Sequence, residues 1–66
     1  MIIKLNGKDE KFEKKLTISE LINVKKLDKN GVVVLLNDKV IKRDRFDEFI
    51  IEDKDRVEIL RFVAGG

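Results

Sequence analysis

Apolar residues fall on alternate positions at both ends of the chain, a period that predicts β-strands. The first predicted strand covers residues 1–5, and the Asn6-Gly7 pair after it is a strong signal for a type I′ hairpin turn. The return strand is predicted over residues 10–16. Its lysines are typical of an edge strand that discourages pairing with other chains.

A helix is predicted next, because the apolar positions change to a helical spacing. Residues 17–20, Thr-Ile-Ser-Glu, form a capping box, and Ile18, Leu21 and Ile22 then give one apolar stripe for a sheet to cover. Leu27 closes this stripe if the helix continues that far. Residues 28–31, Asp-Lys-Asn-Gly, are predicted to end the helix, with the Asn or the Gly in a left-handed cap.

The second half of the chain opens with an unbroken aliphatic run at residues 32–36, which predicts a strand buried on both faces or nearly so. We expect Phe12 and Phe46 to lie in the core. The segments after the run are predicted as a turn at 37–39, a short strand at 40–42, a single helical turn around Phe46, Phe49 and Ile50, and a turn at 53–55.

The last strand begins after this turn and is apolar on both of its faces. Val57 and Ile59 share one parity, which we expect to face the helix, while Leu60 and Phe62 share the other. A strand that is apolar on both parities is typical of the centre of a sheet.

The predicted order of strand, strand, helix, strand, strand, strand favours an α+β fold of the β-grasp type. In that fold a mixed five-stranded sheet wraps one helix, the first and last strands are parallel in its middle, and here a short helical turn precedes the last strand. The alternative is a small OB-type barrel. Such barrels bind single-stranded nucleic acid on aromatic platforms, whereas this chain has four Phe and neither Trp nor Tyr.

Charge adds little beyond a highly solvated surface. Charged residues make up 42% of the 66 residues, well above the usual share of about 25%. The 15 basic and 13 acidic residues nearly cancel, so we expect mixed surface charge, including ion-pair networks of the kind found in heat-stable proteins. Because no basic cluster dominates, nucleic acid is not an expected partner.

Several kinds of chemistry are excluded by composition. The chain contains neither Cys nor His, which removes disulfides, thiol catalysis, imidazole acid–base chemistry and the usual zinc sites. We expect no metal site. No apolar run approaches the roughly 20 residues of a membrane span, and no signal peptide precedes the first strand, so we expect a cytoplasmic protein without a membrane partner.

The chain ends in small residues, Ala64, Gly65 and Gly66. We expect a folded domain over residues 1–63 and a flexible tail over residues 64–66. Glycine lets a backbone approach other groups closely, so such a tail can present its terminal carboxylate to a narrow active site on another protein. The alternative is a frayed end without a role.

Several short segments together carry a family likeness: residues 3–7, 17–22, 36–37, 40–41 with Arg43, 51–53, 55–59 and 63–66. In these segments the chain resembles the ThiS family, the ubiquitin-like β-grasp sulfur carriers of thiamin biosynthesis. Many family members carry Pro where this chain has Lys42, and a third glycine where it has Ala64. The molybdopterin-synthase small subunit and ubiquitin-like protein modifiers share the fold and the Gly pair.

The resemblance implies a carrier rather than an enzyme. An E1-like activating enzyme, ThiF, would adenylate the carboxylate of Gly66 with ATP and Mg²⁺, with no cofactor bound to the carrier itself. A sulfur donor such as a cysteine desulfurase would supply a persulfide that converts Gly66 to a thiocarboxylate. That sulfur would then pass to the thiazole synthase, ThiG.

The expected docking residues are Leu60, Phe62 and Val63, with Ile2 or Lys4 beside them on the parallel neighbour. The alternative is that the loop around Phe46 and Phe49 covers Leu60 and Phe62. Three other functions stay open: a sulfur carrier for molybdopterin synthesis, a ubiquitin-like protein modifier, and a β-grasp binding module whose Gly pair does nothing.

Overall fold

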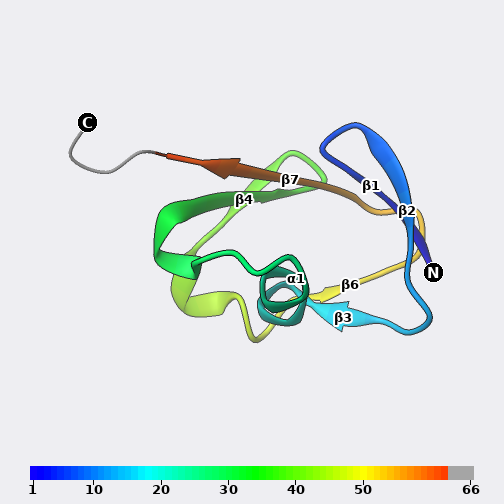
Figure 1. Cartoon of the computed structure of the whole chain (residues 1–66), viewed down its shortest axis with the longest axis horizontal. Helices are drawn as coiled ribbons and strands as arrows, with labels where there is room; N and C mark the ends of the chain where they lie inside the picture. Colours follow the sequence, from blue (N-terminus) through cyan, green and yellow to red (C-terminus); the bar gives the residue numbers. More distant parts are fainter. Residues whose placement is uncertain (63–66) are drawn as a thin grey trace.

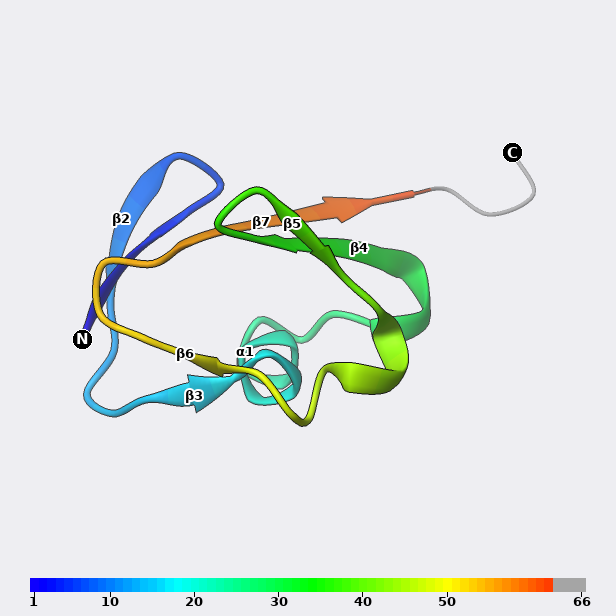
Figure 2. The same ribbon diagram turned by 180° about the vertical axis from the view of Figure 1, so that it is seen from behind.

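The computed structural model describes residues 1–62 as a five-stranded sheet packed against one helix (Figure 1). The order of strands in this sheet is β2-β1-β7-β4-β5, and β3 and β6 form a separate two-stranded sheet beside α1 (Figure 2). The elements are β1 (Ile2–Leu5), β2 (Lys8–Lys11), β3 (Leu16–Thr17), α1 (Ile18–Val24), the 3-10 helix η1 (Lys29–Gly31), β4 (Val32–Leu36), β5 (Lys39–Ile41), the 3-10 helix η2 (Arg43–Arg45), β6 (Ile50–Ile51) and β7 (Arg56–Arg61).

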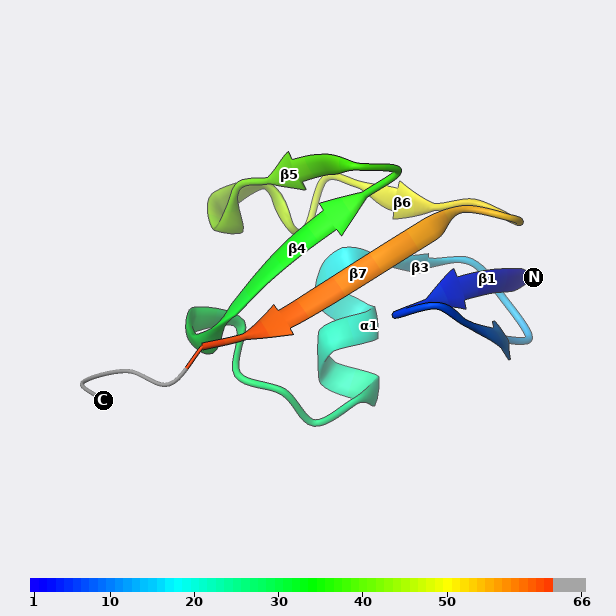
Figure 3. The same ribbon diagram turned by 90° about the horizontal axis from the view of Figure 1, so that it is seen from above.

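The last strand, β7, is the central strand of the main sheet (Figure 3). It runs parallel to β1, with Leu5 opposite Val57, and antiparallel to β4, with Val33 opposite Leu60. The predicted β-grasp arrangement is therefore confirmed, and the OB-barrel alternative is wrong. The central position of β7 is explained by burial, because Val57 and Ile59 are buried on the side of the sheet that faces the helix.

The predicted hairpin turn is confirmed, but its return strand was placed too late. Asn6 and Gly7 both have positive φ, 50° and 83°, as a type I′ turn requires. This two-residue turn puts Lys8 opposite Leu5, so pairing begins at Lys8 and ends at Lys11. Phe12 makes the last contacts of this ladder, because it exchanges two hydrogen bonds with Met1 before the chain leaves the sheet.

The rest of the predicted return strand forms β3, which pairs with β6. Strand β6 was not predicted, because two residues carry no detectable period. A helical turn precedes the last strand as predicted, but it lies earlier than the predicted residues 46–50. The turn is η2 at Arg43–Arg45, and the chain delivers Phe46 from the end of η2 into the core at 2% exposure. Ile50 instead lies in β6 and is exposed.

The helix begins as predicted and ends earlier. The Thr17 hydroxyl accepts a hydrogen bond from the Glu20 amide at 3.1 Å, and the Glu20 carboxylate accepts one from the Thr17 amide at 2.8 Å. At the other end Lys26, with φ of 58°, takes the left-handed position, and the Leu27 amide donates to the Ile22 carbonyl. This is a Schellman motif, so the helix does not reach the predicted Asn-Gly cap.

The core is apolar and lies between the sheet and α1. Ile18, Leu21 and Ile22 are buried, as predicted from the helical stripe. Phe12 is partly buried and packs against this core. The expectation that residues 32–36 are buried on both faces is wrong, because Val33 is 36% exposed on the outer face of the sheet.

Ion pairs on the described surface are separate and do not form a network. Among residues 1–62 they join Lys4 to Asp9, Lys15 to Glu52, Lys25 to Glu10, Arg45 to Glu48, and Arg56 to Asp38. The hydrogen bond and charge of Glu52 raise the pKa of Lys15. Exposed pairs of this kind contribute little to stability. No helix within residues 1–62 is long and apolar enough to cross a membrane.

Candidate functional site

The candidate site is the C-terminal end of β7, the last strand that the structure describes (Figure 1). The inward side chains Val57 and Ile59 anchor the strand, with exposures of 0% and 6%. The last described main-chain hydrogen bond runs from the Phe62 amide to the Gly31 carbonyl at 3.2 Å. The expected site residues Val63, Ala64, Gly65 and Gly66, and the predicted domain boundary, lie outside the described residues.

Two asparagine side chains hold β7 in position. Asn6 Oδ1 accepts from the Ile59 amide at 2.7 Å, and Asn6 Nδ2 donates to the Ile59 carbonyl at 3.3 Å. Asn37 Oδ1 accepts from the Arg56 amide at 2.9 Å. Each asparagine is the first residue of a hairpin turn and has a positive φ. Its side-chain amide therefore makes the hydrogen bonds to β7 that the backbone of a continuing strand would otherwise make. The sequence prediction used Asn6 only as a turn signal and missed this second role.

The outward face of β7 carries the exposed docking residues that the sequence predicts. Leu60 and Phe62 are 55% and 47% exposed. Phe46 is buried in the core and Phe49 packs against it, so neither aromatic ring covers the outward face. The alternative in which this loop hides Leu60 and Phe62 is therefore wrong.

The neighbours of these residues differ from the prediction. Ile2 and Lys4 lie at the other end of β7, since Lys4 is opposite Arg56. Instead, Val33 of β4 lies opposite Leu60, because β1 ends before it reaches this part of β7. Leu35 and the exposed Val40 follow on the outer face of β4 and β5. We call the set Val33, Leu35, Val40, Leu60 and Phe62 the outer patch.

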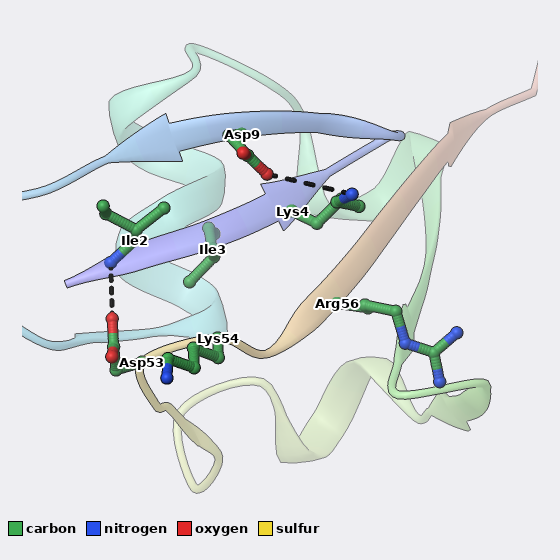
Figure 4. Close-up of a pocket in the computed structure, with 7 residues that line it drawn as sticks. All are labelled: Ile2, Ile3, Lys4, Asp9, Asp53, Lys54 and Arg56. Carbon is green, nitrogen blue, oxygen red and sulfur yellow. Dashed lines mark hydrogen bonds and ion pairs between the residues drawn. The ribbon is translucent and has the colours of Figure 1, made fainter.

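A hollow of about 440 Å³ lies at the far end of the same sheet face, where Figure 4 shows its lining. Asp53 Oδ1 accepts a hydrogen bond from the Ile2 amide at 2.7 Å, and Lys4 lies 3.9 Å from Asp9. Arg56 is paired with Asp38 at 2.8 Å. The Asp53 contact ties the start of β1 to the turn before β7, and the two ion pairs join neighbouring strands and turns, so we assign this hollow a structural role.

Polar and charged side chains of the described residues lie outside the buried core. Within residues 1–62 no buried side chain is polar or charged, and no three acidic side chains are grouped to hold a metal ion. Without Cys or His, the chain also lacks a thiol nucleophile and an imidazole base. The composition therefore excludes thiol and imidazole chemistry at this site.

Comparison with known proteins agrees with this arrangement. The ThiS family model matches residues 3–66. The sulfur carrier protein ThiS of Bacillus subtilis (strain 168) is 38% identical over 66 residues, which cover 98% of this chain and all of that protein. The crystal structure of the thiamine biosynthesis protein ThiS from Geobacter metallireducens superposes with a TM-score of 0.87 at 35% identity, with both chains fully covered.

A third relative is much longer. A thiazole synthase of Paramagnetospirillum magneticum is 26% identical over 66 residues, which span the whole of this chain but 20% of that protein. The full-length matches in sequence and structure show the family without it. The chain belongs to the ThiS family, the sulfur carrier proteins of thiamin biosynthesis.

Proposed function

We propose that Gly66 carries sulfur as a C-terminal thiocarboxylate for the synthesis of the thiamin thiazole. The observation that carries this proposal is the family match, which runs through residue 66 and so includes the Gly65-Gly66 pair. The absence of Cys and His supports it, because a carrier needs no catalytic side chain.

The first step activates the carboxylate, which is a poor electrophile because charge and resonance oppose attack. A carboxylate oxygen of Gly66 attacks the α-phosphorus of ATP on an E1-like ThiF-type enzyme, forming an acyl-adenylate and releasing pyrophosphate. Mg²⁺ and basic groups of that enzyme neutralise the phosphates. The small side chains of Ala64 and Gly65 allow the backbone to enter a narrow channel.

The second step exchanges oxygen for sulfur. The terminal sulfur of a persulfide, supplied by a cysteine desulfurase, attacks the acyl carbon of Gly66 and AMP leaves. A thiol then reduces the resulting acyl disulfide, which leaves the thiocarboxylate on Gly66 and a disulfide on the donor side.

The acceptor in this proposal is a ThiG-type thiazole synthase. The thiazole synthase of Paramagnetospirillum magneticum supports this choice, since one stretch of it aligns with the whole of this chain. A carrier-like segment within a synthase is consistent with two proteins that act together.

We propose that the outer patch and Val63 dock on these partners. Exposed aromatic and aliphatic residues that cluster on a rigid strand are suited to be interface anchors. Leu60 and Phe62 lie on the outward face of β7 immediately before the tail, so contact there brings the tail to the partner.

Intact-mass spectrometry tests this function. The chain is incubated with a ThiF-type enzyme, ATP, Mg²⁺, a persulfide donor and a thiol, and should gain the mass difference between one sulfur and one oxygen atom. Omission of ATP is the negative control, and ThiS of Bacillus subtilis is the positive control. An unchanged mass beside a converted positive control would refute the proposal.

The acceptor is tested separately. The thiocarboxylate form should support thiazole formation by a ThiG-type synthase. Transfer instead to a molybdopterin-synthase large subunit, or conjugation to lysines of other proteins, would favour the alternative carrier or modifier functions.

A further inference from the structure

One stretch of the central strand has an open edge. Strand β1 lies beside the first part of β7 (Figure 3), and the pairing of the two strands ends at Val57. Beyond it the Asn6 side chain bonds the amide and carbonyl of Ile59. The Phe62 amide points toward β4, where it bonds Gly31. Because strand residues alternate in direction, the amide and carbonyl of Arg61 point to the opposite side, where no residue among 1–62 pairs with them.

A hollow of about 350 Å³ lies beside this open edge, between the β1–β2 hairpin and the end of α1. Its apolar lining includes Leu5, Leu27 and Ile59, and Lys8 and Arg61 contribute basic side chains. An unpaired main-chain edge next to a side-chain pocket is the arrangement that recognises an added β-strand. In such binding the backbone supplies hydrogen bonds and the pocket supplies specificity.

The charges around the hollow indicate what kind of segment fits. Glu10 and Lys25 neutralise each other in an ion pair. Lys8 and Arg61 form no ion pair with any residue among 1–62, so the hollow has an excess of positive charge. An acidic side chain is its natural complement.

We propose that an extended segment of the activating enzyme adds to β7 at Arg61 as a further strand. This segment places an apolar side chain in the hollow and an acidic side chain beside Lys8 and Arg61. The inference rests on the proposed function, because it names a contact that the adenylating partner makes.

The activating enzyme is chosen because it is the first protein that must seat the free carboxylate. It has no covalent bond to the tail at that stage, and reaction requires the carboxylate oxygen and the phosphorus to be held at about 3–3.5 Å. A strand paired at Arg61 sets the direction of the chain five residues before Gly66. It therefore reduces the conformational freedom that remains to be lost when the carboxylate is seated.

Amide hydrogen exchange of the ¹⁵N-labelled chain tests the pairing directly. Addition of unlabelled activating enzyme should slow exchange of the Arg61 amide by at least roughly tenfold. The Asp9 amide is the control, because it lies outside the outer patch and faces the free edge of β2. Its neighbour on β1, Lys4, directs its own amide to the Asp55 carbonyl and not to β2. The Asp9 amide should keep its exchange rate.

A matched pair of charge reversals tests the recognition of the hollow. Lys8 and Lys39 both follow a two-residue hairpin turn, and both are exposed. Lys8→Glu should weaken binding to the activating enzyme by about tenfold, whereas Lys39→Glu should leave it nearly unchanged. Both variants should keep the unfolding midpoint of the parent chain.

Four results would overturn the inference. The first is an Arg61 amide that stays unprotected from exchange in the complex, and the second is an equal effect of the two charge reversals on binding. The third is protection of the Arg61 amide in the dilute free chain, and the fourth is protection that rises with chain concentration in the absence of the enzyme. The third result would assign the edge to the chain's own tail, and the fourth to a second copy. If adenylation proceeds while the Arg61 amide stays unprotected, the strand contact fails and the sulfur-carrier function stands. If the chain is never adenylated, the proposed function itself fails.

Discussion

Truncation of Phe62 separates a docking role from a role in the core. Phe62 lies on the outer face of the sheet at 47% exposure, whereas Phe46 lies in the core at 2%. Burying a whole Phe side chain is worth about 1.5–3 kcal/mol. Since about half of Phe62 is already in water, Phe62→Ala should cost roughly 1 kcal/mol of unfolding free energy.

The same change in the core gives the contrast. Phe46→Ala should cost about 3–5 kcal/mol, because it adds a cavity to the lost burial. A domain of this size has a total stability of only about 3–10 kcal/mol. Phe46→Ala should therefore abolish or nearly abolish cooperative unfolding, while Phe62→Ala lowers the unfolding midpoint by about 4–8 °C.

For binding to the activating enzyme we expect the reverse order, with Phe62 contributing more than Phe46. Phe62→Ala should weaken binding to the activating enzyme by about 1–3 kcal/mol, or roughly 5- to 150-fold, as expected for an exposed aromatic anchor. Calorimetric titration at a temperature where the variant is fully folded measures this loss. A core-sized destabilisation with unchanged affinity per folded molecule would show that Phe62 is a structural residue, and the docking surface would have to lie elsewhere.

Further predictions follow from the tail and the backbone contacts. Deletion of Gly66 should abolish adenylation in a pyrophosphate-exchange assay with little change in thermal stability, and adenylation at the parent rate would contradict the carrier assignment. Asn6→Gly tolerates the positive φ but loses both hydrogen bonds to Ile59, so it should destabilise by about 1–3 kcal/mol in denaturant unfolding; a neutral effect would show that the clamp contributes nothing. Thr17→Ala removes the helix cap and should cost about 0.5–2 kcal/mol by the same measurement. Lys26→Gly should instead stabilise by about 0.5–1 kcal/mol, because φ is 58° there, and a loss of stability would mean that the Lys side chain outweighs the strain.

Local features of this protein could be predicted from sequence because they depend on a few adjacent residues. The capping box at Thr17 and the type I′ turn at Asn6-Gly7 each need only side chains within four positions, and both are as predicted. The parity of Val57 and Ile59 also identified the inward face of β7 correctly. The family resemblance then supported the predicted fold and indicated a role for the Gly65-Gly66 pair.

Element boundaries were less predictable, since competing local signals are settled by packing. The helix ends at a left-handed Lys26 and not at Asn30 or Gly31, because Leu27 packs against the core and its amide bonds Ile22. Likewise the pairing of the first hairpin stops after Phe12, which bonds Met1, and not at the predicted Leu16.

The sequence by itself therefore determined the order of the elements, the two faces of the last strand and the chemistry that the chain cannot perform. Only the tertiary structure decided which residues share a surface. The neighbour of Leu60 is Val33 and not Ile2 or Lys4, because strand register depends on where each hairpin turns. The open edge at Arg61 has the same origin: β1 turns away at Asn6, 55 positions earlier in the chain. Such a contact is set by the pairing of distant strands, which no local pattern of residues records.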